Sequence, residues 1–578
     1  MPLYKKIKSE IQLSSARFSS ICLFTLPLRQ ADGSGFFVGL WANSRELIGM
    51  KKYLCTAIVC VLLFQPQFTD NSGYLLGQGK AGVADRPNII FIMTDDHTKQ
   101  AMSCYGSQIN QTPHIDRIAR EGIRFENSFV TNSICAPSRA VALTGKYSHI
   151  NGLKDNRDRF DGDQMTFPKL LQKAGYQTAL VGKWHLKTSP QGFDTWKILP
   201  GQGNYYNPRF ITKNDTMRYE GYVTTLITDF AIEALKNFDQ EKPFCLLYFH
   251  KAPHRNWMPD SKHLTMYDGV DIPMPETFFD DYQTRSDAAR QQDMEVINLY
   301  NSTDMKIHSN GKEEEYSGGN EKFRINASEN WRSLYNSLTD EQRKAWDTAY
   351  EPKNRAFLEA NLSGVELAKW KYQRYIKDYL RCVASVDDNI GRLLDYLDEH
   401  GLTENTVVIY TSDQGFYLGE HGWYDKRFMY EESLGMPLII RYPQEISAGR
   451  TLDEMVLNLD FCPTILDYAE VEVPAEIQGE SLRPLLRGDP PPQWRQMIYY
   501  HYYEYPHGWH DVKRHYGIRT RNFKLIHFYD DIDAKELYDL QQDPHELNNV
   551  YGRAQFNGIQ NELETQLKEL KKYYKDFE

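Results

Sequence analysis

Two pairs of oxygen-bearing side chains end apolar segments that lie far apart in the sequence. Asp95 and Asp96 follow one apolar run, and Asp413 and Gln414 follow another. Carboxylate and amide oxygens are hard ligands, which suit Ca²⁺ better than Zn²⁺, because zinc prefers Cys and His. A single Asp at a strand end often only caps the next helix. Two such pairs together favour a calcium site.

A third candidate group surrounds Cys135 in the segment Cys-Ala-Pro-Ser-Arg. Pro137 suits the first turn of a helix, so the segment predicts that Cys135 stands at a helix N-terminus. The partial positive charge of that helix end, together with Arg139, favours a bound anion and would also favour the thiolate form of Cys135. A cysteine nucleophile of the thiol-protease kind is the rival interpretation. No single His–acid partnership stands out, however, and the clustered carboxylates suit a metal better.

These groups must be held together by a common scaffold. Four short apolar runs predict the buried strands of that scaffold. The runs cover residues 88–93, 178–181, 244–249 and 406–411. The second run leads into Lys183 and His185, and the third leads into Lys251 and His254. Open α/β sheets bind ligands at the carboxyl ends of their strands. We therefore expect all these polar side chains to lie near one edge of a sheet.

The remaining segments predict an α/β layer fold with an added C-terminal part. Apolar residues at helical spacing over 383–397 predict a helix packed on the sheet, and the tyrosines and Trp370 upstream are interpreted as core and surface of the same helix. The polar segment 260–364 predicts an insertion near or over the site, or plain surface decoration. The Pro-rich stretch 488–492 predicts a linker. Strand-like runs and an amphipathic segment beyond it predict a small antiparallel sheet with a packed helix.

Length and composition fit an enzyme with a large core. The chain has 578 residues, of which 41% are hydrophobic and 13% aromatic, so it can bury one large domain and a smaller one. We expect a catalytic domain over 86–488 and a C-terminal subdomain over 493–578. The net charge of −11 argues against a nucleic-acid partner, because such proteins usually carry a surplus of Lys and Arg on one face. A small anionic substrate needs only a local basic pocket.

The first 80 residues are expected to lie outside the mature enzyme. Residues 1–49 show no sustained period and are interpreted as an upstream extension, with Met50 as the expected start. Residues 50–80 predict a signal peptide and linker, because Lys51 and Lys52 precede an apolar run. That run is too short to span a bilayer comfortably. We therefore expect cleavage and export, with no membrane span in the mature protein.

Five cysteines lie beyond these N-terminal segments: Cys104, Cys135, Cys245, Cys382 and Cys462. None is part of a CxxC pair, so they predict neither a disulfide framework nor a zinc site. All except Cys135 are expected to be buried structural cysteines.

The segment at 135–139 resembles the maturation motif Cys-x-Pro-Ser-Arg of the type I, formylglycine-dependent sulfatases. Other stretches resemble that family in the same order: PNIIFIMTDDH, TGKYSHINGL, GKWHL, KAPH and SDQGFYLGEHGWYDKR. The resemblance extends from about Arg86 to the C-terminus. It implies an α/β fold of the alkaline-phosphatase-like sulfatase type, with a large mixed sheet flanked by helices.

The resemblance also implies catalytic roles. Cys135 is oxidised to formylglycine by a sulfatase-maturating enzyme, and the hydrate of that group attacks the sulfur atom. Arg139 and Lys183 hold the hydrate and the sulfate as fixed cations. His185 takes a proton from the second hydroxyl, so that the aldehyde returns.

Further roles concern the leaving oxygen and the metal. By the resemblance, His254 and Lys426 bind sulfate and help to protonate the leaving oxygen. The implied calcium ligands are Asp95, Asp96, Asp413, Gln414 and the group made from Cys135. The family commonly has Asn where this chain has Gln414, which is one methylene longer but carries the same amide oxygen. We therefore expect the amide to bind calcium with a geometry that departs from the family pattern.

A sulfated carbohydrate is the expected substrate. The stretches 412–443 and 508–529 look most like bacterial sulfatases that remove the 6-sulfate of N-acetylglucosamine in glycosaminoglycans such as heparan sulfate, or in mucin-type glycans. The residues predicted to contact the sugar are His421, His507, His510 and Arg514. With the signal peptide, the resemblance implies a periplasmic, cell-surface or secreted bacterial enzyme.

Two other functions stay open on the sequence. The family shares its fold with phosphatases and phosphodiesterases, so a phosphoester or phosphonate monoester is an alternative substrate. Enzymes of that group with Ser or Thr nucleophiles are disfavoured by Cys135. A carbohydrate-binding protein that has lost catalysis is the second alternative, although every expected catalytic position is filled.

Overall fold

The computed structural model describes residues 22–24, 39–41, 86–307 and 321–578. The chain forms two compact units, Met1–Gly79 and Lys80–Glu578. In the first unit, strands β1 (Cys22–Phe24) and β2 (Gly39–Trp41) pair antiparallel. The predicted extension at 1–49 and the predicted signal peptide and linker at 50–80 otherwise fall outside the described residues.

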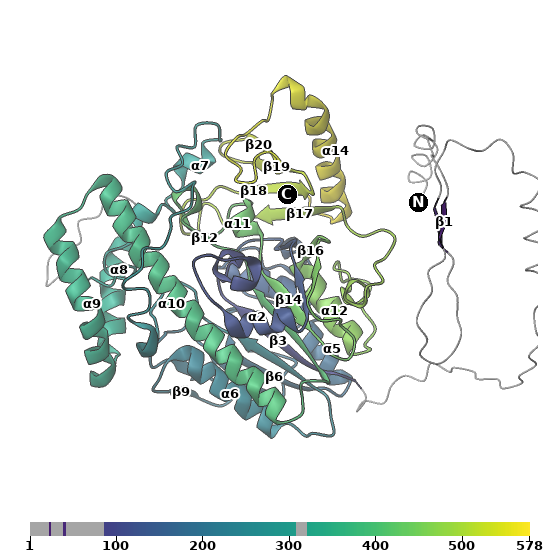
Figure 1. The fold of residues 1–578 in the computed structure, drawn as a ribbon, viewed down its shortest axis with the longest axis horizontal. Coiled ribbons are helices and arrows are strands. Elements are labelled where there is room, and N and C mark those ends of the chain that lie inside the picture. The colour runs from purple at the N-terminus through teal and green to yellow at the C-terminus, as the bar shows by residue number, and fades with distance from the viewer. Residues whose placement is uncertain (1–21, 25–38, 42–85, 308–320) are drawn as a thin grey trace, which may run out of the picture. The chain divides into compact units, whose positions relative to one another are not determined.

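A ten-stranded mixed sheet forms the centre of the second unit (Figure 1). Its parallel part consists, in spatial order, of β11 (Thr406–Ser412), β3 (Asn88–Thr94), β10 (Phe244–Phe249), β6 (Gln177–Lys183) and β7 (Thr195–Leu199). The β11 side continues with β14 (Leu438–Arg441), β4 (Ile123–Phe125) and β15 (Arg450–Leu452), and the β7 side with β8 (Arg209–Ile211) and β9 (Thr216–Arg218). The four predicted strands are confirmed.

Side chains of the central strands alternate between two hydrophobic cores. Ile89 and Phe91 of β3 belong to one core, whereas Ile90 and Ile92 belong to the other. Successive side chains of a strand point to opposite faces, so a strand buried on both faces must be apolar throughout. This requirement explains the uninterrupted apolar runs in the sequence.

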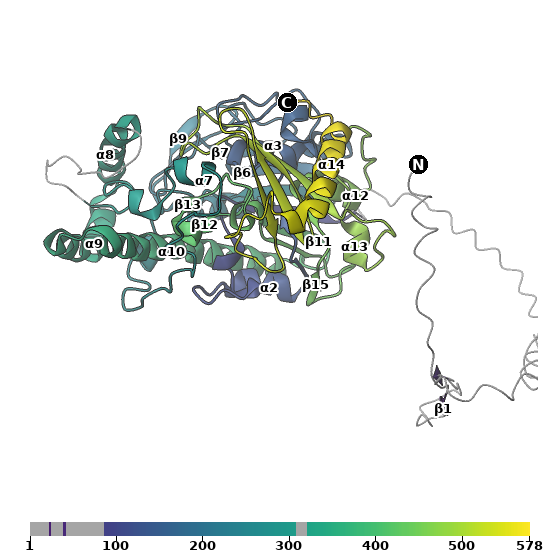
Figure 2. The same cartoon turned by 90° about the horizontal axis from the view of Figure 1, so that it is seen from above.

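Helices cover both faces of the sheet (Figure 2). The core that includes Ile90 is covered by α2 (Pro113–Arg120), α6 (Val223–Asn237) and α10 (Gly364–Glu399). The core that includes Ile89 is covered by α3 (Cys135–Thr144), α5 (Phe167–Lys173) and α12 (Phe461–Tyr468). The helix predicted over 383–397 is the second half of α10. It begins earlier because its buried face continues upstream through Tyr372, Tyr375 and Tyr379.

A four-stranded antiparallel sheet forms the C-terminal part. Its strands are β17 (Met497–Tyr502), β18 (His515–Thr520), β19 (Phe523–Phe528) and β20 (Ala534–Asp539), and α14 (Asn557–Tyr573) packs on it. Tyr499 and Ile518 belong to the same hydrophobic core as Ile89. The predicted small sheet with a packed helix is therefore confirmed, and it is joined to the main sheet through shared apolar side chains. The predicted linker at 488–492 lies between α13 (Arg483–Arg487) and β17.

The described part of the polar segment 260–364 contains several helices. It contains α7 (Ala288–Gln291), α8 (Glu321–Asn336) and α9 (Asp340–Ala360). Trp331, Trp346 and Tyr350 are buried in the core beside α10. Short elements complete the unit: α4 (Ser148–Asn151), α11 (Glu431–Leu434), the pair β5 (Ser128–Phe129) and β16 (Val456–Leu457), and the pair β12 (Tyr417–Leu418) and β13 (Tyr424–Asp425).

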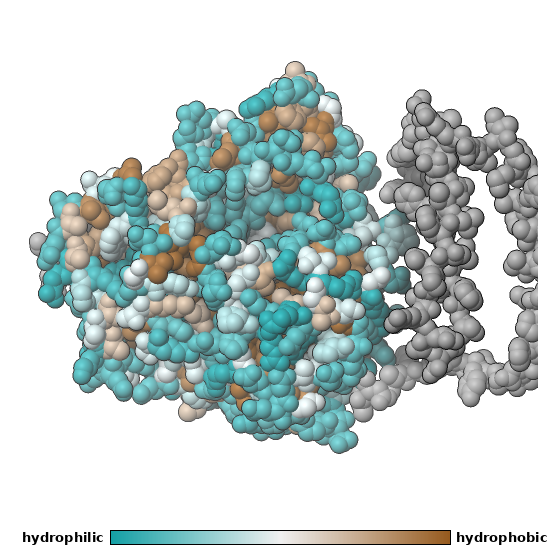
Figure 3. Space-filling model, viewed as in Figure 1, coloured by the Kyte–Doolittle hydropathy of each residue, from teal (hydrophilic) through white to brown (hydrophobic). Residues whose placement is uncertain are grey.

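The visible surface of the described residues is mainly hydrophilic, with scattered hydrophobic patches (Figure 3). Single exposed apolar side chains such as Leu358 and Val365 are ordinary in globular proteins. Among the described residues, no helix combines the length and the apolar character needed to cross a membrane.

Candidate active site

The carboxyl ends of β3 and β11 bring together the two oxygen-bearing pairs. Asp95, Asp96 and Asp413 are fully buried, and one carboxylate oxygen of each lies within 4.8 Å of the others. β3 and β11 are parallel neighbours in register, with Ser412 opposite Thr94. The residues that follow each strand therefore emerge side by side, as the sequence predicts.

Each of these three carboxylates has a cation of its own. Lys183 contacts Asp95 through an ion pair, and Lys426 Nζ lies 2.8 Å from Asp96 Oδ2. Arg139 places Nε and Nη2 each 2.9 Å from Asp413 Oδ2. All six side chains are buried, so the cluster is a compact array of alternating charge at the edge of the sheet.

Burial acts against the ionisation of these acids. It raises the pKa of Asp96 to about 6 and that of Asp413 to about 7, and the neighbouring Asp95 adds to both shifts. Burial also opposes ionisation of Asp95, but Lys183 and other nearby cations hold the pKa of Asp95 well below its usual range. Three carboxylates in one desolvated cluster favour further positive charge beside them.

Two acceptor oxygens in the cluster are unsatisfied. Asp95 Oδ1 and Gln414 Oε1 are buried and have no hydrogen-bond partner within the described part of the chain. Gln414 Nε2 donates to Asp96 and lies 3.8 Å from Cys135 Sγ. Buried acceptors without partners are rare in folded proteins. Oxygen donors gathered in this way fit a hard cation.

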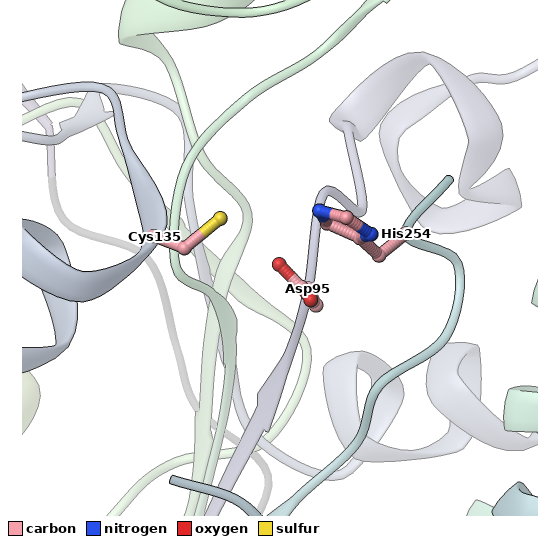
Figure 4. Close-up of side chains that lie close together, drawn as sticks. All are labelled: Asp95, Cys135 and His254. Carbon is pink, nitrogen blue, oxygen red and sulfur yellow. The ribbon is translucent and has the colours of Figure 1, made fainter. Parts of the chain in front are cut away.

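Cys135 is the first residue of α3, in agreement with the helix start predicted from Pro137. Its sulfur points towards Asp95 and His254, and the three side chains offer ligand atoms within 4.8 Å of one another (Figure 4). The expected preference for a thiolate is wrong. Burial of the side chain raises the pKa of the Cys135 thiol, because desolvation outweighs the nearby Lys183 and Lys426.

Two histidines lie beside this thiol in their neutral forms. Burial lowers the pKa of His185 and of His254 well below the usual range, and Lys183 lowers both further. His254 Nδ1 donates to the carbonyl oxygen of Arg255 at 2.6 Å, which leaves Nε2 facing Asp96 Oδ2 at 3.8 Å. His185 Nδ1 is buried without a hydrogen-bond partner among the described residues. Both rings therefore offer a nitrogen lone pair to the site.

The backbone around these side chains is unusual. Gly182 has φ +106°, and a Cβ there would come within 1.8 Å of the Phe249 carbonyl oxygen. Only glycine allows β6 to approach β10 so closely just before Lys183. Asp96 and His185 also adopt left-handed φ values of 68° and 59°. Such strain is commonly stored where side chains must be aimed at a functional site.

A cleft of about 1050 Å³ opens onto this cluster. Cys135, His185, His254 and Lys426 lie at its inner end. The segment 260–364 contributes Tyr300, Thr303, Asn330 and Leu334, and the C-terminal part contributes Glu504, His507, Gly508, Trp509 and His510. Described residues of the predicted insertion therefore line the cleft, together with residues of the C-terminal part.

Of the predicted sugar-contacting residues, His507 and His510 line the cleft. His510 is buried, and its Nδ1 lies 2.9 Å from Asp293 Oδ1 while Nε2 lies 3.4 Å from Asp425 Oδ2. Its ring is thus fixed by two acids. His507 is exposed at the cleft.

The other two predicted sugar-contacting residues, His421 and Arg514, do not line the cleft. His421 is fully buried and does not line the cleft; its Nδ1 lies 2.9 Å from Asp280 Oδ2. Burial alone would lower the pKa of His421, but Asp280 and Glu432 raise it to about 9. Arg514 donates through Nε to the Tyr503 carbonyl oxygen at 2.9 Å and is likewise not among the cleft residues. Both side chains hold the protein together.

Several residues of the cleft were not predicted. Arg255 forms two hydrogen bonds with Asp304, at 2.8 and 2.6 Å, and Arg427 pairs with Glu504. Arg255 and Arg427 directly follow the motif residues His254 and Lys426. Their place in the sequence could therefore have predicted that they line the cleft. Asp304 and Glu504 lie in segments with no motif, and only the folded chain brings them to these arginines.

Comparisons with known proteins assign the chain to a family. A sequence model described as Sulfatase matches residues 87–471, and one described as N-sulphoglucosamine sulphohydrolase, C-terminal, matches residues 419–573. The chain belongs to the sulfatase family. This sulfatase is 53% identical over 497 residues to an N-acetylglucosamine-6-O-sulfatase of Bacteroides thetaiotaomicron, covering 85% of this chain and 87% of that protein. The predicted family and reaction class, sulfuric ester hydrolysis, are confirmed.

Solved structures agree with this assignment. One, of a protein in complex with its substrate D-glucosamine-2-N,6-O-disulfate, has a TM-score of 0.81 and 52% identity, covering 85% of this chain and 99% of that one. The phosphonate monoester hydrolase of Agrobacterium radiobacter has a TM-score of 0.61 and 18% identity, covering 85% and 96%. The second likeness shows a shared fold alone, and the predicted alkaline-phosphatase-like architecture is confirmed.

Proposed function

We propose that this sulfatase hydrolyses the 6-O-sulfate ester of N-acetylglucosamine in glycosaminoglycans such as heparan sulfate, or in mucin-type glycans. The observation that carries the proposal is 53% identity, over 85% of the chain, to a protein with that named activity. A structural neighbour captured with a 6-O-sulfated glucosamine supports it. So does a cleft whose inner end gathers cations around Cys135.

In the proposed reaction, Cys135 marks the point of attack and the surrounding cations hold the sulfate. Burial keeps the unmodified thiol protonated and therefore a poor nucleophile, which supports conversion of Cys135 to formylglycine. That group supplies the attacking hydroxyl when hydrated. Lys183 and Lys426 are already fixed by Asp95 and Asp96, so they stabilise developing negative charge without reorganising. Arg139 is fixed by Asp413 in the same way.

We assign the two neutral histidines to proton transfer. His185 is proposed to accept a proton beside Cys135, which its unbonded and buried Nδ1 supports. His254 and Lys426 are proposed to bind the sulfate and to assist protonation of the leaving oxygen. The hydrogen bond from His254 Nδ1 to the Arg255 carbonyl oxygen turns Nε2 towards the cleft, where Nε2 must first take up a proton before it can give one to the leaving oxygen.

Ca²⁺ is the proposed resident ion, held by Asp95, Asp96, Asp413 and Gln414. The donor set fits, because it offers only oxygen atoms, and two of them lack hydrogen-bond partners among the described residues. The group made from Cys135 would complete the ligands. The ion would polarise the sulfate and offset the charge of the carboxylates.

Removal of calcium with a chelator is expected to lower both activity and thermal stability. An ion present at about 100 times its Kd adds about 3 kcal/mol to the free energy of unfolding. Its removal would leave three buried carboxylates without the positive charge that offsets them. Calorimetric unfolding and sulfate release, each before and after metal removal, test this expectation. Added Ca²⁺ should restore both quantities and Mg²⁺ should not. Unchanged stability and activity in protein proved metal-free would contradict the assignment.

Hydrolysis of phosphoesters or phosphonate monoesters is the second candidate, favoured by the fold shared with a phosphonate monoester hydrolase. Initial rates on N-acetylglucosamine 6-sulfate and on the matched 6-phosphate separate the two. We expect kcat/KM to be about 100-fold or more higher for the sulfate. A higher value for the phosphate would overturn the proposal. Sugar binding with no hydrolysis of either ester would indicate a glycan-binding protein that has lost catalysis.

We also propose that the protein is exported to the periplasm, cell surface or medium of a bacterium. The basic residues Lys51 and Lys52, followed by an apolar run, support an export signal. A formylglycine-generating enzyme is the implied partner, because the Cys135 segment matches the form that such enzymes modify.

A further inference from the structure

Lys251 is a buried cation of the cleft that the proposed reaction does not use. It follows β10 by two residues, lines the cleft and is 3% exposed. Its Nζ lies 4.5 Å from the centre of the Tyr205 ring and 3.4 Å from the Arg255 carbonyl oxygen. Tyr205 in turn donates to the His254 carbonyl oxygen at 2.5 Å. Lys251 is therefore held beside His254 by an aromatic ring and a carbonyl group.

Lys251 differs from the buried cations of the carboxylate cluster in its lack of an acidic partner among the described residues. Arg139, Lys183 and Lys426 each form an ion pair with one carboxylate of the cluster. No described carboxylate lies within 4.0 Å of Lys251 Nζ, and its contact with the Arg255 carbonyl oxygen is long. A buried charge without a counter-ion is costly, and such groups persist where a ligand supplies the opposite charge. Burial lowers the pKa of Lys251 to about 8, so most of these side chains are still charged at neutral pH.

Two arginines of the cleft have acidic partners. Arg255 forms two hydrogen bonds with Asp304, and Arg427 pairs with Glu504. Arg157 also lines the cleft but is exposed, so Lys251 is the buried cation of the cleft that an additional anion would meet without an acidic partner in place. An ammonium group with unused donors can bind a sulfate or a carboxylate equally well.

We propose that Lys251 forms a second anion subsite, which binds an oxyanion of the substrate other than the sulfate that is removed. The inference rests on the proposed function, because it takes a sulfated glucosamine as the substrate. Two sources share this chemistry: an N-sulfate on the same glucosamine, and the carboxylate of a neighbouring uronic acid. Lys251 would then set the preference of the enzyme among glycosaminoglycan units.

The test is Lys251→Met, which keeps the length of the side chain and removes its charge. Three substrates are compared: N-acetylglucosamine 6-sulfate, N-sulfoglucosamine 6-sulfate, and a uronic acid–N-acetylglucosamine 6-sulfate disaccharide. We expect kcat/KM to fall about 10- to 100-fold for a substrate whose second oxyanion contacts Lys251, and by less than about threefold for the first sugar. A loss of kcat/KM confined to the N-sulfated sugar, or to the disaccharide, identifies which of the two oxyanions Lys251 binds. Lys251→Arg should restore part of the preference.

The control is Lys213→Met, because Lys213 donates to a backbone carbonyl oxygen outside the cleft. It should leave all three rates unchanged. Equal losses on all three substrates with Lys251→Met, or no loss on any, would overturn the proposal. If the wild-type enzyme turns over none of them, the proposed function fails instead. In that case, the subsite is tested by binding. The affinities of the same three sugars are measured for the Cys135→Ala protein and for the double variant Cys135→Ala, Lys251→Met.

The melting temperature distinguishes an anion subsite from a purely structural role of Lys251. Lys251→Met removes a buried charge without an acidic partner, so its melting temperature should equal or exceed that of the wild type. A clear decrease, with uniformly reduced activity, would show that Lys251 serves the fold.

Discussion

Replacement of Cys135 with alanine is expected to abolish sulfate ester hydrolysis, with kcat lower by on the order of 10⁴-fold or more. Alanine cannot be oxidised to formylglycine, and it leaves no nucleophilic atom at the point that faces Asp95 and His254 (Figure 4). The change removes one buried sulfur atom, so the protein should still fold. Turnover of a 6-sulfated glucosamine and the melting temperature of the same preparation test both expectations.

Cys104→Ala is a matched control, because Cys104 lies outside the cleft and is only partly buried. It should retain the wild-type rate. Mass spectrometry of the Cys135 peptide tests the chemistry directly, since formylglycine leaves that peptide about 18 Da lighter than the thiol form. Full activity in a preparation in which Cys135 is entirely a thiol would contradict the proposed mechanism.

The central sheet could be predicted because its strands are buried on both faces. Such strands need continuous apolar runs, which stand out in a sequence without any alignment. The run ending at Thr411 and the run ending at Met93 then imply that Asp413 and Asp95 meet, because parallel neighbours end at the same edge. The start of α10 could not be placed in the same way. Its buried tyrosines alternate with polar residues and carry a weaker signal.

The cluster around Cys135 was predictable for a related reason. Lys183 ends β6, and His185 and His254 come within five residues of a strand end, so their positions depend mainly on local sequence and on strand order. The protonation state of Cys135 was not predictable in this way. A helix end and an arginine both favour a thiolate, but burial outweighs them, and burial is known only once the chain is folded.

The sugar-binding side of the cleft was the least predictable part. His421 and His507 look equally suitable in the sequence, yet one is fully buried against Asp280 and the other lines the cleft. The difference arises from segment 260–364, which supplies Asp280 and also part of the cleft wall. Contacts between segments so far apart in sequence leave no local signature in either one. Residue type alone therefore could not separate a buried, packed histidine from one that lines the cleft.

Replacement of His185 with alanine is expected to lower the steady-state kcat by about 10²- to 10⁴-fold, the usual contribution of a general base. Lys183, Arg139 and Lys426 keep their carboxylate partners in this variant, so substrate binding and kcat/KM should change little, and KM should fall together with kcat because the second step limits turnover. His185 is proposed to act after the substrate has lost its sulfate. The first turnover should therefore proceed, and each enzyme molecule should release about one desulfated sugar before the rate falls.

His254→Ala provides the matched contrast, because His254 is also neutral, partly buried and next to the same ion pairs. It is proposed to assist departure of the leaving oxygen, so its loss should slow the first turnover and remove the burst. Rapid-quench measurement of sugar release distinguishes the two variants even if their steady-state rates are equal. A burst with His254→Ala and none with His185→Ala would reverse the assignment of the two histidines. Because both rings face the same sulfate, the order of events is the observation that can separate their roles.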